Sequence, residues 1–231
     1  MSKFNDDQIE KVAQIVFDEM SCFYDNFIVS AAKQIGEGQR RKQSGDFVED
    51  LLQVALGKIS EETGITIESR VGTTDFFKRK ITTETGEELS DEKIQVDRHN
   101  YINQNLFSVI ENKSNLDACY CKRALSDFVD IADSIYENGG DPRLIKYIIF
   151  SGQKALDETK RKFLLEDFKK KTTKYYSSEE EIENGNAHGL PCETFFIING
   201  RRQSSKPVYK TNPGLNESEI KRFVRYIMFI I

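Results

Sequence analysis

Histidine and cysteine are scarce in this sequence, and their placement argues against the common metal and disulfide frameworks. The 231 residues contain two histidines, His99 and His188, which lie far apart, and four cysteines that form no CxxC pair. A structural zinc site needs closely spaced thiolate and imidazole ligands. We therefore expect reduced, partly buried thiols in a cytoplasmic protein and no histidine-rich metal centre.

Long apolar runs are also missing. No run approaches the ~18 residues that a membrane-spanning helix needs, and the apolar C-terminal RYIMFII is only seven residues long. The N-terminal MSKFNDDQIEKV is acidic and lacks the apolar core of a signal peptide. Hydrophobic residues make up 38% of the chain and charged residues 31%, which is typical of an ordinary soluble protein. The length suits a single domain over 1–231 with a full core.

The net charge of −5 argues at first against a nucleic-acid partner, but the charges are unevenly distributed. Residues 143–176 contain ten Lys or Arg against four Asp or Glu, and residues 201–225 contain seven against two. Acidic residues gather at 84–97 and 179–184. A chain with this pattern can present a basic face to DNA, and solvated helix surfaces are the alternative explanation.

Hydrophobic periodicity predicts an alternation of helices and short strands along the chain. The expected helices are 5–36, 46–62, 115–137, 154–175 and 216–229. The expected strands are 65–71, 76–82, 93–99, 105–113, 144–152 and 193–200. Glycine-rich or polar turns are expected at 36–45, 83–92 and 177–187.

Two local patterns favour one fold class. Ser114, with Asp117 three residues later, resembles a capping box that would begin the helix 115–137. Strand 105–113, this helix and strand 144–151 form a βαβ unit. The unit predicts an α/β (mixed α+β) fold with a central mixed sheet flanked by helices.

Acidic and basic side chains gather at the ends of two predicted strands. Glu111 and Lys113 are two residues apart on a strand, so their side chains must share a face. Asp97 can join them if strand 93–99 lies beside strand 105–113. Two neighbouring carboxylates repel each other and favour a divalent cation, and oxygen ligands suit Mg²⁺. A nearby lysine can orient an attacking water, which completes the groups needed to hydrolyse a phosphodiester.

The spacing of these residues resembles the signature of the PD-(D/E)xK nucleases. Asp97 is followed by thirteen residues and then by Glu111-Asn112-Lys113. The order of elements over residues 45–151 also resembles the core of that family: a helix, a strand, the Asp strand, the ExK strand, a helix and a further strand. Val96 stands where the family usually has proline.

The resemblance implies a restriction-endonuclease-like core and a role for each matching residue. Members of the family often carry an acidic residue on the first core helix, and Glu49 matches that position. The cofactor implied is Mg²⁺, for which Mn²⁺ can substitute. The implied catalytic residues are Asp97, Glu111, Lys113 and Glu49, of which Asp97 and Glu111 would hold the metal and Glu49 would assist through water. The backbone carbonyl of Asn112 can also face the metal, because strand carbonyls at this point are free beyond the edge of the sheet.

Within the family, the length and class of the chain point to a type II restriction endonuclease, which cuts double-stranded DNA at a specific sequence. Such enzymes are often homodimers that read palindromic sites. A cognate DNA methyltransferase is expected in the same restriction-modification system, though not as a stable partner. The N-terminal helical and C-terminal regions would be additions that recognise DNA. The alternatives are a structure-specific repair or recombination nuclease, a non-catalytic DNA-binding module and a generic interaction protein.

Basic and amide side chains outside the core are the candidates for DNA contact. Arginine and glutamine read base edges, and basic residues more often hold phosphates. The candidates are Gln39, Arg40, Arg41, Lys42, Gln43, Lys122, Arg123, Arg201, Arg202, Gln203 and Lys206. His99 is expected to be a DNA contact or a plain surface residue.

Overall fold

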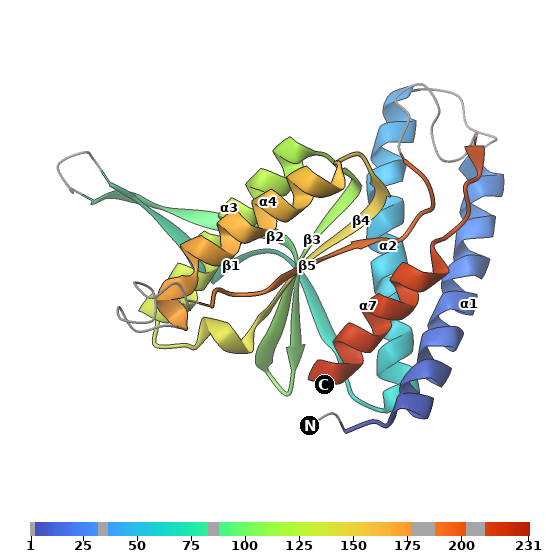
Figure 1. Cartoon of the computed structure of the whole chain (residues 1–231), viewed down its shortest axis with the longest axis horizontal. Helices are drawn as coiled ribbons and strands as arrows, with labels where there is room; N and C mark the ends of the chain where they lie inside the picture. The colour runs from blue at the N-terminus through green and yellow to red at the C-terminus, as the bar shows by residue number, and fades with distance from the viewer. Residues whose placement is uncertain (1–2, 32–36, 83–87, 177–187, 202–210) are drawn as a thin grey trace.

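The computed structural model describes residues 3–31, 37–82, 88–176, 188–201 and 211–231 (Figure 1). The side chains of residues 31, 37–44, 72–82, 88–93 and 95 are outside this description. The helices are α1 (Asp6–Ala31), α2 (Glu37–Thr63), α3 (Ala118–Glu137), α4 (Glu158–Lys171) and α7 (Glu217–Ile230), with short 3-10 turns at Pro142–Leu144 and Thr173–Tyr175. The strands are β1 (Glu68–Thr82), β2 (Glu88–Ile102), β3 (Asn105–Leu116), β4 (Lys146–Lys154) and β5 (Cys192–Phe196).

The five strands form one mixed sheet in the order β1-β2-β3-β4-β5. β1, β2 and β3 are antiparallel neighbours, whereas β3, β4 and β5 are parallel. Parallel neighbours need a crossover, and α3 provides it between β3 and β4. The predicted mixed sheet flanked by helices is therefore confirmed.

Helices cover both sides of the sheet (Figure 1). α1, α2 and α7 pack on one side, where Ile110 and Phe223 are fully buried. α3 and α4 pack on the other side, where Val109 and Phe128 are fully buried. Consecutive residues of β3 thus serve opposite cores, as the pleat of a strand requires. Within the described residues, no helix combines the length and the apolar character needed to cross a bilayer.

The first turns of α2 occupy a segment that its glycines led us to predict as a loop. The segment 36–45 reads GEGQRRKQSG, and the helix begins at Glu37, so the prediction of a helix starting at 46 was wrong. Glycine inside a helix costs only about 1 kcal/mol relative to alanine. The Glu, Gln, Arg and Lys residues of the segment are good helix formers.

β1 is one strand where two were predicted, at 65–71 and 76–82, and β2 begins inside the predicted turn 83–92. The register between β1 and β2 shifts between Thr73 and Lys78, where the predicted gap fell. An irregularity of this kind interrupts the alternation of side chains without ending the strand.

The start of α3 differs from the predicted capping box. Asp117 is itself the N-cap, and its side chain accepts a hydrogen bond from the Tyr120 backbone N–H at 2.9 Å. Ser114 belongs to β3, which continues to Leu116 because it still pairs with β4 there. The remaining predicted helices and strands are present, with ends that differ by a few residues. The predicted turn at 177–187 and the last five residues of the predicted helix 5–36 lie outside the described residues.

Candidate active site

β2 carries a bulge immediately before His99. β1 advances by two residues, from Arg70 to Gly72, while β2 advances by three, from His99 to Val96. Asp97 lies in this extra length, and the ladder between β2 and β3 ends next to it. Bulges are frequent beside active sites, because they re-aim a side chain and end the pairing of strands.

Asp97, Glu111 and Lys113 are in contact at this point. Nζ of Lys113 lies 2.5 Å from Oε1 of Glu111 and 3.5 Å from Oδ2 of Asp97. The same Asp97 oxygen accepts a hydrogen bond from the Asn112 backbone N–H at 2.7 Å. Oε2 of Glu111 accepts one from the Asp97 backbone N–H at 3.4 Å. The two carboxylates therefore bind the backbone donors that a continued ladder would have satisfied.

Glu111 is the more enclosed of the two acids. Its side chain is 10% exposed, compared with 35% for Asp97. Burial raises the pKa of the Glu111 carboxyl above its ordinary value, and the charge of Asp97 raises it further, whereas Lys113 lowers it. A carboxylate that is buried beside a like charge is stabilised by a cation placed between the two.

Glu49 lies apart from this cluster. Its Oε1 is 2.6 Å from Nη2 of Arg98, whose side chain is almost fully buried. In the ladder between β2 and β3, Arg98 lies opposite Ile110, whose side chain belongs to the core on the α2 side. Glu111 is two residues after Val109 on β3, so its side chain lies on the side covered by α3. The structure does not bring the predicted helix acid to the two carboxylates.

The possible metal ligands are few. The part of the chain that the structure describes holds no group of three or more His, Cys, Asp or Glu side chains placed around one ion. Two carboxylates remain, those of Asp97 and Glu111, together with the Asn112 carbonyl. The Asn112 N–H points toward β2, and the C=O of a strand residue points to the same side as its N–H. These oxygen donors fit Mg²⁺, which keeps several waters and needs only one or two protein carboxylates.

Three of the predicted DNA-binding residues have described side chains. Lys122 and Arg123 are exposed on the first turns of α3, directly after β3. Arg201 is exposed, and its backbone forms an isolated β-bridge with Lys154 at the end of β4. Because β3 and β4 are parallel, these positions lie toward the carboxyl ends of the two strands, as Lys113 does.

The other candidates lie at positions whose side chains are outside the description. Gln39, Arg40, Arg41, Lys42 and Gln43 lie on the first turns of α2, and their side chains are outside the description. Arg202, Gln203 and Lys206 lie outside the described residues altogether.

The prediction for His99 was wrong, because its side chain is fully buried. Burial lowers the pKa of the imidazole, and the charge of Arg70 lowers it further, so both disfavour the cationic form that a phosphate contact would use. Sequence reasoning also missed Arg98 as the partner of Glu49. Its place beside Asp97 on an interior strand, where a charge must find a partner, was the available signal.

Gly152 allows β4 to lie against the end of β3. A Cβ at this position would be 2.5 Å from the Ser114 carbonyl oxygen and 3.1 Å from a methyl group of Val48. Because the carbonyl belongs to the backbone next to Lys113, Gly152→Ala must displace that strand end. We expect a loss of about 1–3 kcal/mol in the free energy of unfolding, measured by urea denaturation.

Gly57→Ala is the matched control for this substitution. Gly57 lies inside α2, and a Cβ there would meet no atom within 4 Å. Alanine should therefore raise the free energy of unfolding by about 0.4–1 kcal/mol. Equal effects of the two substitutions would show that the close approach of Gly152 to Ser114 does not matter.

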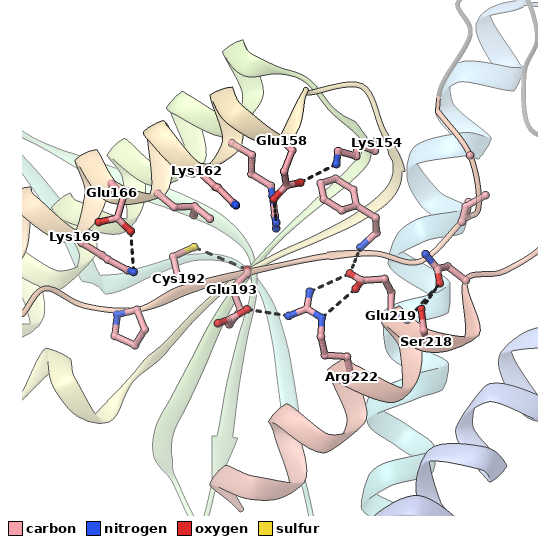
Figure 2. Close-up of a pocket in the computed structure, with 17 residues that line it drawn as sticks. Lys154, Glu158, Lys162, Glu166, Lys169, Cys192, Glu193, Ser218, Glu219 and Arg222 are labelled. Carbon is pink, nitrogen blue, oxygen red and sulfur yellow. Dashed lines mark hydrogen bonds and ion pairs between the residues drawn. The ribbon is translucent and has the colours of Figure 1, made fainter.

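A charged groove of about 730 Å³ lies elsewhere, along the outer edge of β5 between α4 and α7 (Figure 2). Most of its cations already have carboxylate partners. Nζ of Lys154 lies 2.8 Å from Oε2 of Glu158, and the other oxygen of Glu158 contacts Arg161. Lys169 lies 3.1 Å from Glu166. The groove therefore offers little unpaired positive charge to an anionic ligand.

Two side chains of α7 cap the edge strand in this groove (Figure 2). Arg222 donates a hydrogen bond to the Thr194 carbonyl, and Glu219 accepts one from the Phe196 N–H at 3.2 Å. The Arg222 guanidinium also lies 4.1 Å from the centre of the Phe195 ring. Exposed strand edges invite pairing with other chains, and charged side chains that occupy the edge prevent it.

The ion pairs of Glu158 should make the free energy of unfolding depend on pH. Hydrogen bonds from Arg161 and then Lys154 lower the pKa of the Glu158 carboxyl from 4.5 to about 2. The stabilisation is therefore present above the unfolded pKa and is lost as the pH falls from 4.5 toward 2. Glu158→Gln should cost about 0.5 kcal/mol near neutrality, since the side chain is half exposed. Denaturation at several pH values should show this difference shrinking below pH 4.5; a constant difference would contradict the assignment.

No protein-family model matches the chain, and no curated protein matches its sequence.

Proposed function

We propose that this protein is a Mg²⁺-dependent endonuclease that hydrolyses phosphodiester bonds of double-stranded DNA at a specific sequence, as type II restriction enzymes do. The observation that carries the proposal is the contact of Asp97, Glu111 and Lys113 beside the bulge of β2. Their order and spacing resemble the PD-(D/E)xK signature. The bulge of β2 contains Asp97, and the pleat of β3 puts Glu111 and Lys113 on one face.

The order of elements supports a restriction-endonuclease-like core. From α2 to β4 the chain runs helix, strand, strand, strand, helix, strand. The second strand carries Asp97, the third carries Glu111 and Lys113, and the fourth is parallel to the third. This is the order expected from the resemblance over residues 45–151. On this proposal α1 and the region from β5 to α7 are the additions around the core.

The proposed chemistry assigns one task to each residue. Asp97 and Glu111 would hold Mg²⁺ through carboxylate oxygens, and Asn112 would add its backbone carbonyl. When bound, Mg²⁺ neutralises charge on the phosphate and lowers the pKa of water. Lys113, whose ammonium lies between the two acids, would orient the attacking water and stabilise the growing negative charge. Release of the 3′ oxygen, which leaves a 5′ phosphate, is implied by the family resemblance.

The proposal includes partners. A sequence-specific enzyme of this kind would bind DNA as a homodimer with a two-fold axis, so that a palindrome matches the symmetry of the protein. Lys122, Arg123 and Arg201, which are exposed near the end of the sheet that carries the cluster, would contact phosphates. A cognate methyltransferase would protect host DNA without forming a stable complex with this chain.

Incubation of the purified protein with phage DNA tests the proposal. Discrete fragments that require Mg²⁺, disappear with EDTA and are absent with Glu111→Ala are the expected result. Glu166→Ala, which changes an exposed glutamate on α4, serves as the control and should cut normally. The fragment ends would give the recognition sequence.

Other outcomes would decide between the alternatives. Cutting of branched or flapped DNA alone would indicate a repair or recombination nuclease. Binding of DNA without cleavage of any substrate would indicate a non-catalytic module, in which the Asp97–Glu111–Lys113 contact is only a cap at a strand end.

A further inference from the structure

The ion pair between Glu49 and Arg98 joins α2 to β2 at the position that follows Asp97. Oε1 of Glu49 lies 2.6 Å from Nη2 of Arg98. The Arg98 side chain is 6% exposed and that of Glu49 is 36% exposed. A buried guanidinium needs a counter-ion, because an unpaired charge in the interior is strongly disfavoured.

Arg98 also stands where the pairing of β2 and β3 stops. Its partner Ile110 is the last β3 residue in the ladder before Glu111. On the β1 side, Arg98 and Asp97 together form the bulge between His99 and Val96. Any movement of Arg98 would therefore shift the Asp97 backbone, and with it the hydrogen bond of 2.7 Å to the Asn112 N–H.

One oxygen of the Glu49 carboxylate is already held by Arg98, on the α2 side of β2. The Glu111 carboxyl lies on the opposite side of the sheet, and the charges that act on it are those of Asp97 and Lys113. Nε of Arg98 already has no hydrogen-bond partner among the described residues. Loss of the Glu49 contact would remove the one carboxylate that lies within ion-pair distance of this guanidinium in the described part of the chain.

We propose that Glu49 acts through Arg98 as a positioning residue that fixes the bulge carrying Asp97, and that it is not a metal ligand. This inference rests on the proposed nuclease function, and it reassigns the helix acid from a catalytic to a positioning role. Mutation of a residue that orients a metal ligand without binding the metal typically lowers metal affinity by about 10–100-fold.

A double-mutant cycle with Mn²⁺ as the probe tests the inference. Mn²⁺ affinity is measured by isothermal titration calorimetry for the unaltered protein, Glu49→Gln, Arg98→Met and the double variant. Each single variant should weaken Mn²⁺ binding by about 10-fold, and the double variant should be no weaker than the worse single one. The kcat of DNA cleavage should fall in parallel while KM for DNA stays unchanged.

Controls separate positioning from folding. Glu10→Gln removes the carboxylate of another ion pair, with Arg225 on α7, and should leave Mn²⁺ affinity unchanged. Glu49→Gln keeps the shape of the side chain, so it keeps the test valid if Arg98→Met does not fold.

Three outcomes would overturn the inference. Equal weakening by Glu49→Gln with and without Arg98 would make Glu49 a ligand. No effect of either single variant on Mn²⁺ affinity would leave the pair without a positioning role. If the unaltered protein neither binds Mn²⁺ nor cuts DNA, the proposed function fails and the inference fails with it. If the unaltered protein is active and either of the first two outcomes is found, only the inference is rejected.

Discussion

Lys113→Ala should reduce DNA cleavage by at least about 100–1,000-fold while DNA binding in Ca²⁺ persists. Loss of one group that stabilises transition-state charge typically costs this much in kcat. The Lys113 ammonium lies 2.5 Å from Glu111 and 3.5 Å from Asp97, so alanine would remove the cation that faces both acids. Single-turnover cleavage and a gel-shift assay measure the two quantities separately.

Lys58→Ala is the matched control for Lys113→Ala. Lys58 lies on α2 and forms an ion pair of 2.9 Å with the exposed Glu61. Its removal should change neither cleavage nor binding, since exposed pairs contribute little. If Lys113→Ala instead abolished folding and DNA binding together, Lys113 would be a structural residue that caps the end of β3, and the catalytic assignment would be wrong.

Phe223→Ala should cost about 3–5 kcal/mol in the free energy of unfolding, as expected for a fully buried phenylalanine. Phe223 anchors α7 to the sheet, where its ring lies 5.0 Å from that of Phe150 and 5.2 Å from that of Phe195 in edge-to-face geometry. Such pairs add to the gain from burial. Urea denaturation followed by circular dichroism measures the loss.

Phe229→Ala provides the comparison on the same helix. Phe229 is 71% exposed, so its truncation should change stability by no more than about 0.5 kcal/mol. The two variants remove the same ring from one helix and differ only in its burial. Similar losses from both would mean that α7 is held by its ends or by its ion pairs and not by the aromatic cluster.

The helices and strands were largely predictable because hydrophobic periodicity is local. The stripe of α3 and the apolar run of β4 can be recognised in short windows of sequence, and both elements are present. The errors fell where local signals conflict. Glycines in 36–45 indicated a loop, although the surrounding residues favour a helix. The start of α3 at Asp117 depended on how far β3 remains paired with β4, which is a tertiary fact.

The candidate site was predictable only in part. Glu111 and Lys113 share a strand, so the pleat alone places their side chains on one face. Asp97 was assigned to them through its spacing, and the bulge that brings it there could not be read from the residues. His99 was misassigned because a polar residue near a strand end is usually exposed, whereas this one lies inside the sheet between β1 and β3.

By itself the sequence determined which chemical groups this protein carries and their order along the chain. Spacing on a strand is a property of covalent geometry, so the Glu111–Lys113 pair needed no further information. Only the tertiary structure decided which distant groups meet. It joined Glu49 to Arg98 across 49 positions and left the helix acid outside the carboxylate cluster. The physical reason is that a buried guanidinium must find a counter-ion, and where that counter-ion lies depends on how α2 packs against the sheet.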